Sequence, residues 1–321
     1  MEGSWKSSAL VELLLFSAGA VVFFEASVFI VIFVIPLAVL YRRRGFYTGL
    51  AGCLLTVCGI ICVKLYHLLR ISGAMRYDLL GIALVVPVSF LIGLAILEAP
   101  VARRLRTWQR LLCASLAGGL VYVPLLYLLL VSAEFDAMLR AQVDAMLRSF
   151  QTNEASLMPL VSAEQIVRLS RQVFLNTFLA GFFFTLAANW VIGVKMARRL
   201  EGIAGEFPAY RSFRMPEKAV YVFLGSWALV FATLFRDLGL LGVAAWNCAL
   251  LVALLYMCQG VGIIKVRTEG LPRGFKMLVI VLCFTLIFTA GIVVILGIMA
   301  GVSLLGVSEL WINYRKKGVS P

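Results

Sequence analysis

A few polar side chains interrupt the long apolar stretches of this sequence, and they are the first candidates for chemistry. A polar or ionisable group at membrane depth costs free energy unless it faces the interior of a helical bundle or a water-filled cavity. Such a group therefore marks either a ligand or proton site or a structural contact between helices. The candidate ligand-binding residues on this criterion are Glu25, Asn189, Trp190, Asn247 and Gln259.

Each of these candidates has a structural alternative. The Glu25 carboxylate suits a ligand or proton site, but it also suits a break between two helices near the outer surface. Asn189 followed by Trp190 places an amide beside an aromatic ring, which suits a ring-containing ligand or ordinary helix packing. Asn247 and Gln259 are 12 residues apart, so they lie at different depths of one helix and need not share a site. Buried amides of this kind also hydrogen-bond across helices.

Catalytic and metal chemistry have little support in the sequence. His67 is the only histidine, and the seven cysteines lie in apolar stretches without an accompanying carboxylate cluster. The patterns His-Glu-x-x-His, Gly-x-Ser-x-Gly and the phosphate-binding loop are missing from the sequence. We therefore expect a protein that is not an enzyme and that has no metal site and no cofactor.

The composition points to a lipid bilayer as the main partner of the chain. Hydrophobic residues make up 62% of the 321 residues, charged residues 14%, and the mean hydropathy is +1.00. A soluble domain is close to half apolar and a quarter charged. The net charge of +13 comes from Lys and Arg clustered between apolar stretches, as in cytoplasmic loops, so nucleic acid is not an expected partner.

The spacing of the apolar stretches predicts an all-α fold. A helix needs about 20 apolar residues to cross a bilayer. We therefore predict a polytopic transmembrane bundle of eight to nine membrane helices with an external amphipathic helical hairpin. The predicted helices cover 8–24, 27–41, 46–66, 77–98, 111–132, 173–194, 219–235, 239–264 and 277–308, the last too long for one upright helix. The predicted divisions are a six-helix bundle over 1–196, a cytoplasmic amphipathic connector over 197–217, C-terminal membrane helices over 218–308 and a polar basic tail over 309–321.

Charge predicts the orientation of these helices, because loops rich in Lys and Arg stay in the cytoplasm. Alternation of the helices puts all four basic loops on one side, and the N-terminus joins them there. The polar segment 133–172 has balanced charge and falls outside the membrane. The basic loops are 42–45, 99–110, 195–218 and 265–276.

The external segment 133–172 has its own helical pattern. The string from Asp136 to Arg140 recurs from Asp144 to Arg148, and both place opposite charges four residues apart. Ser162 precedes Gln165 with the spacing of a capping box. We predict two helices that either lie flat on the outer membrane surface or cover the end of the bundle.

The last third of the chain resembles a known family. The residues that carry the resemblance are Phe213-Arg214-Met215-Pro216, Asn247, Leu254 to Gly260, Leu304-Leu305-Gly306, Glu309, Trp311 and Arg315. They are similar to the YybS-type family of uncharacterised bacterial membrane proteins, in which an Asp stands where this chain has Glu309. The resemblance implies a multi-pass protein of the bacterial cytoplasmic (inner) membrane.

The resemblance also implies possible partners. The first six helices are similar to the substrate-binding subunits of energy-coupling-factor transporters. There, small residues of the first helix contact a coupling protein, and 17–20 supply such residues here. Partner or headgroup contacts are expected at Arg214, Glu309, Trp311 and Arg315.

Two functions from different classes follow. The first is a transporter-like component that binds a small molecule within the helical bundle. The alternative is a non-transporting membrane scaffold or assembly factor, which acts on a cytoplasmic partner through its basic connector and tail.

Overall fold

The computed structural model confirms the all-α class and separates into two compact units. Unit 1 is Met1–Ile203 and unit 2 is Ala204–Pro321. The structure describes residues 2–26, 31–72, 77–124, 133–151, 162–202, 213–268, 270–312 and 314–315. Most of the predicted connector, at 203–212, lies outside the described residues.

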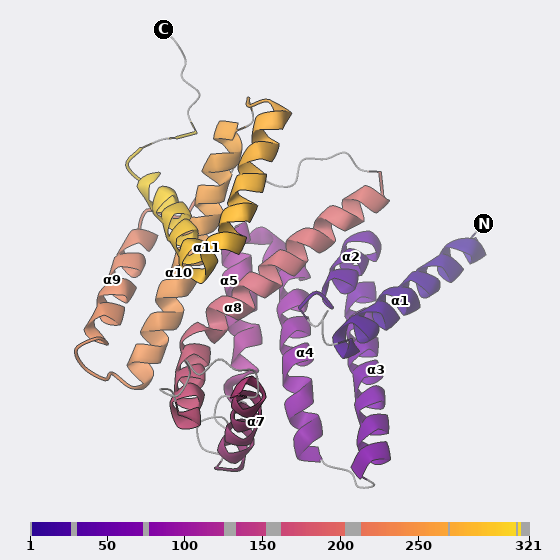
Figure 1. Ribbon diagram of the computed structural model, residues 1–321. Helices are drawn as coiled ribbons and strands as arrows, with labels where there is room; N and C mark the ends of the chain where they lie inside the picture. Colours follow the sequence, from indigo (N-terminus) through magenta and orange to yellow (C-terminus); the bar gives the residue numbers. More distant parts are fainter. Residues whose placement is uncertain are drawn as a thin grey trace. The chain divides into compact units, whose positions relative to one another are not determined.

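Unit 1 is built from helices that differ widely in length (Figure 1). Gly45 has φ of +86°, a conformation that glycine adopts at no steric cost, and it separates the second helix from the third. The elements of unit 1 are α1 (Glu2–Glu25), α2 (Ile35–Arg44), α3 (Phe46–Ser72), α4 (Tyr77–Glu98), η1 (Ala102–Arg104), α5 (Thr107–Leu120), α7 (Ala133–Gln151) and α8 (Ala163–Leu200).

The first apolar stretch is broken where the sequence predicts, but its second helix is shorter than predicted. The first helix ends at Glu25, and 31–34 form turns before α2. α2 has ten residues, about 15 Å, which is half the thickness of the bilayer's apolar layer. Its last residue, Arg44, pairs with Glu12 in the first half of α1. The predicted helix over 27–41 therefore begins only at Ile35 and continues to Arg44, while 27–30 lie outside the described residues.

Other boundaries of unit 1 also differ from the predictions. α3 continues to Ser72, past its predicted end at 66, and α5 ends at Leu120, while 125–132 of the predicted helix 111–132 lie outside the described residues. α8 is continuous over 38 residues and includes the end of the external segment, the predicted span and the start of the predicted connector. An apolar helix continues past a predicted loop when no proline or capping residue stops it.

The segment 133–172, predicted to be external, is helical in its described parts, as the sequence predicts. α7 covers Ala133–Gln151, and Ser162 caps α8 by accepting a hydrogen bond from the backbone N–H of Gln165. The Gln165 side chain accepts in turn from the backbone N–H of Ser162. The second predicted helix of the hairpin is therefore the beginning of α8 rather than a separate helix.

The described residues contain four helices that are long and apolar enough to cross a membrane. Shorter apolar helices accompany them at Ala83–Glu98, Ala219–Ala232 and Val294–Ser308. This supports a helical membrane protein, and the predicted number of eight or nine spans stays unconfirmed. The four long segments are Ser8–Glu25, Phe46–His67, Ala163–Leu200 and Leu240–Thr268.

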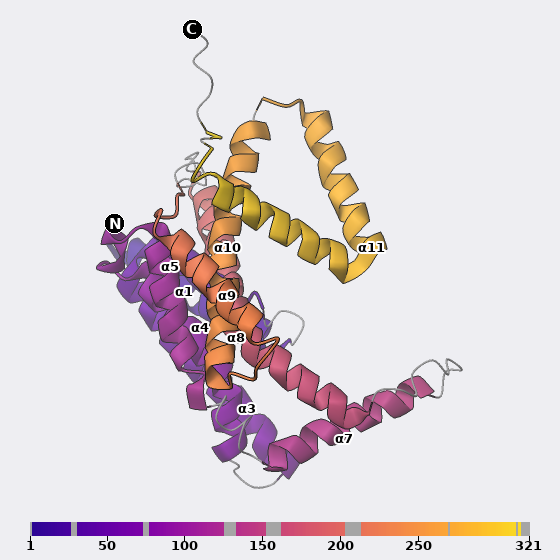
Figure 2. The ribbon, with the colours of Figure 1, turned by 90° about the vertical axis from the view of Figure 1, so that its left-hand side faces the viewer.

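Unit 2 contains three helices, α9 (Ala219–Ala232), α10 (Leu240–Thr268) and α11 (Arg273–Ser308), within the part that the structure describes. Figure 2 shows that α11 bends sharply, so that its last part returns to α10. There Gly306 lies directly against the backbone carbonyl of Tyr256, and Gly260 lies against that of Val302. Glycine permits this close approach because a side chain would collide with the facing backbone. The predicted segment 277–308 therefore lies within one continuous helix that is bent, neither straight nor interrupted (Figure 2).

Candidate functional site

Asn189 holds the break between α1 and α2. Its Nδ2 donates to the backbone carbonyl of Val31 at 2.6 Å and to that of Thr185 at 2.7 Å. The side chain lies in the middle of α8 and is 2% exposed. Its Oδ1 has no hydrogen-bond partner among the described residues. Asn189 thus stabilises unwound backbone and keeps one buried acceptor available.

Trp190, the next residue of α8, contacts a different group. Its indole N–H donates to Oε1 of Glu98 at 2.7 Å, and Glu98 is fully buried at the end of α4. Nε of Arg42 lies 2.9 Å from the same oxygen, and Nη2 of Arg103 lies 4.0 Å from the other. A buried carboxylate needs such cationic and hydrogen-bonding partners to stay charged.

A third arginine, Arg110, completes this group. The guanidinium carbons of Arg42 and Arg110 each lie 5.6 Å from the centroid of the Trp190 ring, within range of a cation–π interaction. Nη2 of Arg110 also donates to the backbone carbonyl of Leu97. We call Arg42, Glu98, Arg103, Arg110 and Trp190 the arginine cluster. It brings together the ends of α2 and α4, the middle of α8 and the basic loop 99–110.

Glu25 lies on the other side of the break, at the end of α1. Its Oε2 is 2.8 Å from Nζ of Lys64, which lies within α3. The same ammonium group is 5.7 Å from the centroid of the Phe24 ring. The second oxygen of Glu25 is buried and has no hydrogen-bond partner among the described residues. Glu25 and Asn189 therefore flank the break but contact different elements.

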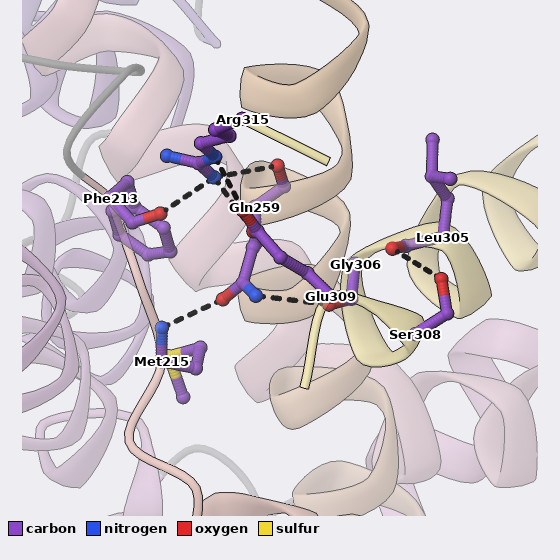
Figure 3. A network of polar contacts seen from close by, with 8 residues as sticks. All are labelled: Phe213, Met215, Gln259, Leu305, Gly306, Ser308, Glu309 and Arg315. Atoms are coloured by element: carbon purple, nitrogen blue, oxygen red, sulfur yellow. Dashed lines mark hydrogen bonds and ion pairs between the residues drawn. The ribbon is translucent and has the colours of Figure 1, made fainter. Parts of the chain in front are cut away.

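Three sequence candidates of unit 2 meet in one polar network (Figure 3). Gln259 accepts from the backbone N–H of Met215 at 2.7 Å and donates to the Gly306 carbonyl at 3.0 Å. Arg315 lies 2.8 Å from Oε1 of Glu309 and 3.0 Å from its Oε2, and also donates to the Phe213 carbonyl. We call Gln259, Glu309 and Arg315, with these backbone partners, the tail network.

The burial and the charge balance of the tail network indicate a structural contact within the chain rather than a binding site. The side chains of Glu309 and Arg315 are 4% and 6% exposed. Burial lowers the pKa of the Arg315 guanidinium, and the neighbouring Glu309 carboxylate opposes that effect. One carboxylate balances one guanidinium, and both ends of the pair contact the chain itself. The network ties the segment before α9 and the residues after α11 to the middle of unit 2.

The remaining sequence candidates belong to neither polar group, although Arg214 and Trp311 lie next to the tail network. Asn247 is buried in α10 and donates to the carbonyl of Val243 on its own helix. Arg214 is exposed, and Trp311 is 72% exposed after the end of α11. Of the ligand-binding candidates, Glu25 and Asn189 therefore lie beside the break, Trp190 in the arginine cluster and Gln259 in the tail network, while Asn247 lies apart.

Sequence reasoning missed the centre of the arginine cluster. Glu98 is the last residue of an apolar stretch and stands directly before a strongly basic loop. That position is as typical of a carboxylate on an exposed helix end as of a buried one. The burial of its carboxylate depends on Arg42 and Trp190, which are 56 and 92 residues away.

Comparison with known proteins gives a family without an assigned activity. No curated protein and no solved structure matches the chain. A family described as predicted membrane protein (DUF2232) matches residues 10–299, which is most of the 321 residues. The chain therefore belongs to the DUF2232 family of predicted membrane proteins.

Proposed function

We propose that unit 1 binds a small molecule at the break between α1 and α2, as a transporter-like component that catalyses no reaction. The observation that carries the proposal is the environment of Asn189. Its Nδ2 donates to the Val31 carbonyl in the turn before α2 and to a carbonyl of its own helix, and its buried Oδ1 is without a partner among the described residues. A ligand with an N–H or O–H group would complete its hydrogen bonding.

Broken helices have a physical link to binding in membranes. Every backbone polar group must be satisfied within the protein, because lipid offers no hydrogen bonds. Unwound backbone therefore persists where it is buried in protein or lines a cavity, and secondary transporters place their substrate sites at such breaks near the midplane. The short α2 creates a break of this kind.

Aromatic rings next to the break indicate the shape of the ligand. Phe33, in the turn before α2, has its ring centroid 5.3 Å from that of Phe24 and 6.1 Å from that of Phe90. Phe90 lies 4.5 Å from Phe182 of α8. Ligand sites in proteins are mainly apolar with a few placed polar groups. We therefore propose a compact, largely apolar molecule with a ring and one hydrogen-bond donor.

The proposal is tested by comparing two asparagine variants. Asn189→Leu removes the acceptor at the break, whereas Asn247→Leu removes a buried amide of α10 that also bonds a carbonyl of its own helix. The protein and both variants are purified from native membranes and analysed by native mass spectrometry. We expect a co-purifying small molecule on the wild type and on Asn247→Leu, but not on Asn189→Leu. Equal occupancy of all three proteins would refute the site.

A second candidate function rests on unit 2. Exposed Arg214 and Trp311 flank the tail network, from which Arg315 contacts the carbonyl of Phe213. A basic and an aromatic side chain on one polar end of a membrane protein suit a scaffold that contacts a cytoplasmic protein. Photocrosslinking from position 311 in native membranes tests this function. Protein adducts support it, and adducts with lipid alone exclude it.

A further inference from the structure

We propose that the arginine cluster binds a phosphate group, carried either by a soluble phosphate compound or by a lipid headgroup. This site differs from the one proposed for a small molecule at the break and does not depend on it. Its residues come from α2, the loop after α4, the beginning of α5 and the middle of α8. Phosphate is the expected ligand because of the charge, the geometry and the accessibility of these arginines.

The charge of the cluster is not balanced internally. Arg42, Arg103 and Arg110 surround one carboxylate, that of Glu98. The neighbouring acidic residue Glu12 is paired with Arg43 and Arg44. Among the described residues, the cluster thus has two positive charges more than its carboxylate neutralises. Like charges held this close repel each other, and an anion between them relieves the repulsion.

The guanidinium groups are held in place before any ligand arrives. Arg42 and Arg110 both lie over the ring of Trp190, and that ring is fixed by its own hydrogen bond to Glu98. Arginine binds phosphate through two parallel N–H groups, and this geometry is effective only when the guanidinium plane is oriented. The buried carboxylate and the ring supply that orientation. Snorkelling arginines of an ordinary basic loop have no such support.

The cluster also keeps donors that a phosphate can reach. Arg42 uses its Nε for Glu98 and its side chain is 29% exposed, and Arg103 approaches Glu98 only at 4.0 Å. Arg103 is 52% exposed, whereas Glu98 beneath it is fully buried. The carboxylate is therefore shielded from solvent, while the side chains of Arg42 and Arg103 stay partly accessible to an anion.

The experiment compares two adjacent arginines in the purified full-length protein. Arg103→Gln removes a member of the cluster, and Arg104→Gln removes the same charge from an exposed neighbour that lies outside it. Binding of pyrophosphate is measured by calorimetry in detergent. Binding of phosphatidylglycerol is measured by native mass spectrometry against a neutral glycolipid without phosphate. We expect Arg103→Gln to weaken binding of the preferred probe about tenfold, as the loss of one charge-assisted hydrogen bond does. Arg104→Gln should change it less than twofold.

The two probes separate the sources of the phosphate. Binding of pyrophosphate assigns the site to a soluble phosphate compound, and preference for phosphatidylglycerol alone assigns it to a lipid headgroup. The proposal fails if neither probe binds better than the glycolipid, or if the two variants weaken binding equally. Asn189→Leu should keep full phosphate binding, so failure of the small-molecule site leaves this result unaffected.

Discussion

The arginine cluster of unit 1 and the tail network of unit 2 use the same chemistry in different ways. In the tail network one carboxylate meets one guanidinium, and both are almost completely buried. In the arginine cluster one fully buried carboxylate meets three arginines, of which Arg103 is half exposed. A balanced and closed pair fixes the chain to itself. An unbalanced and open group can accept an external anion, so charge balance and exposure distinguish a structural contact from a binding site.

The largest effect is expected in the tail network. Arg315→Met leaves the Glu309 carboxylate buried without its partner and removes the bond to the Phe213 carbonyl. Breaking a buried pair from one side costs about 3–5 kcal/mol of stability. Thermal unfolding in detergent should show a large decrease in Tm. Arg214→Met, at an exposed arginine, is the control and should leave the Tm nearly unchanged. A small effect at Arg315 would mean that the network does not hold unit 2 together.

Removing the charge of Glu98, at the centre of the arginine cluster, should change the stability of the protein and its affinity for phosphate in opposite directions. Glu98→Gln keeps an acceptor for Trp190 but removes the charge that balances the arginines. We expect the free energy of unfolding to decrease by about 2–3 kcal/mol. This is at or below the lower end of the range for a broken buried ion pair, because the arginines are partly exposed. Affinity for the phosphate probe should rise, since the net positive charge increases. A fall in affinity at unchanged stability would contradict this charge effect and show that orientation of the arginines by the carboxylate matters more.

The glycine contact between α10 and α11 tests whether unit 2 depends on close packing. Gly306→Ala would place a methyl group against the Tyr256 carbonyl, whereas a methyl group at Gly301 meets open space. Forcing atoms into packed space costs about 1–3 kcal/mol. The Tm should decrease for Gly306→Ala and stay constant or rise slightly for Gly301→Ala. Equal behaviour of the two variants would show that the last part of α11 does not pack closely on α10.

The smallest effect is expected at the ion pair beside the break. Glu25 and Lys64 are 21% and 31% exposed, and Glu25→Gln keeps an oxygen that accepts a hydrogen bond from the Lys64 ammonium group. Glu25→Gln should therefore cost less than about 1 kcal/mol. It should also leave phosphate binding unchanged. A loss of ligand at the α1–α2 break in this variant, measured by native mass spectrometry, would instead make Glu25 part of the small-molecule site.

Several features of the fold could be predicted because they depend on local sequence. The length of the apolar stretches determined the helical membrane class, and a carboxylate in the middle of 8–41 indicated the break at Glu25. The spacing of Ser162 and Gln165 indicated the capped start of a helix. Each signal operates within a few residues, since hydrogen bonds of a helix and its cap join near neighbours.

The arginine cluster and the tail network were settled only by tertiary structure. Glu98 becomes buried because Trp190 and Arg42 meet it from other helices, and Gln259 finds its partners in Met215 and Gly306. Contacts over such separations leave no periodic trace in the sequence. The sequence determined where apolar and polar segments lie along the chain. The three-dimensional packing alone decided which polar groups are buried with balanced charge and which keep a net charge and hydrogen-bond donors for a ligand. Charge balance and burial both depend on the partners that folding brings together.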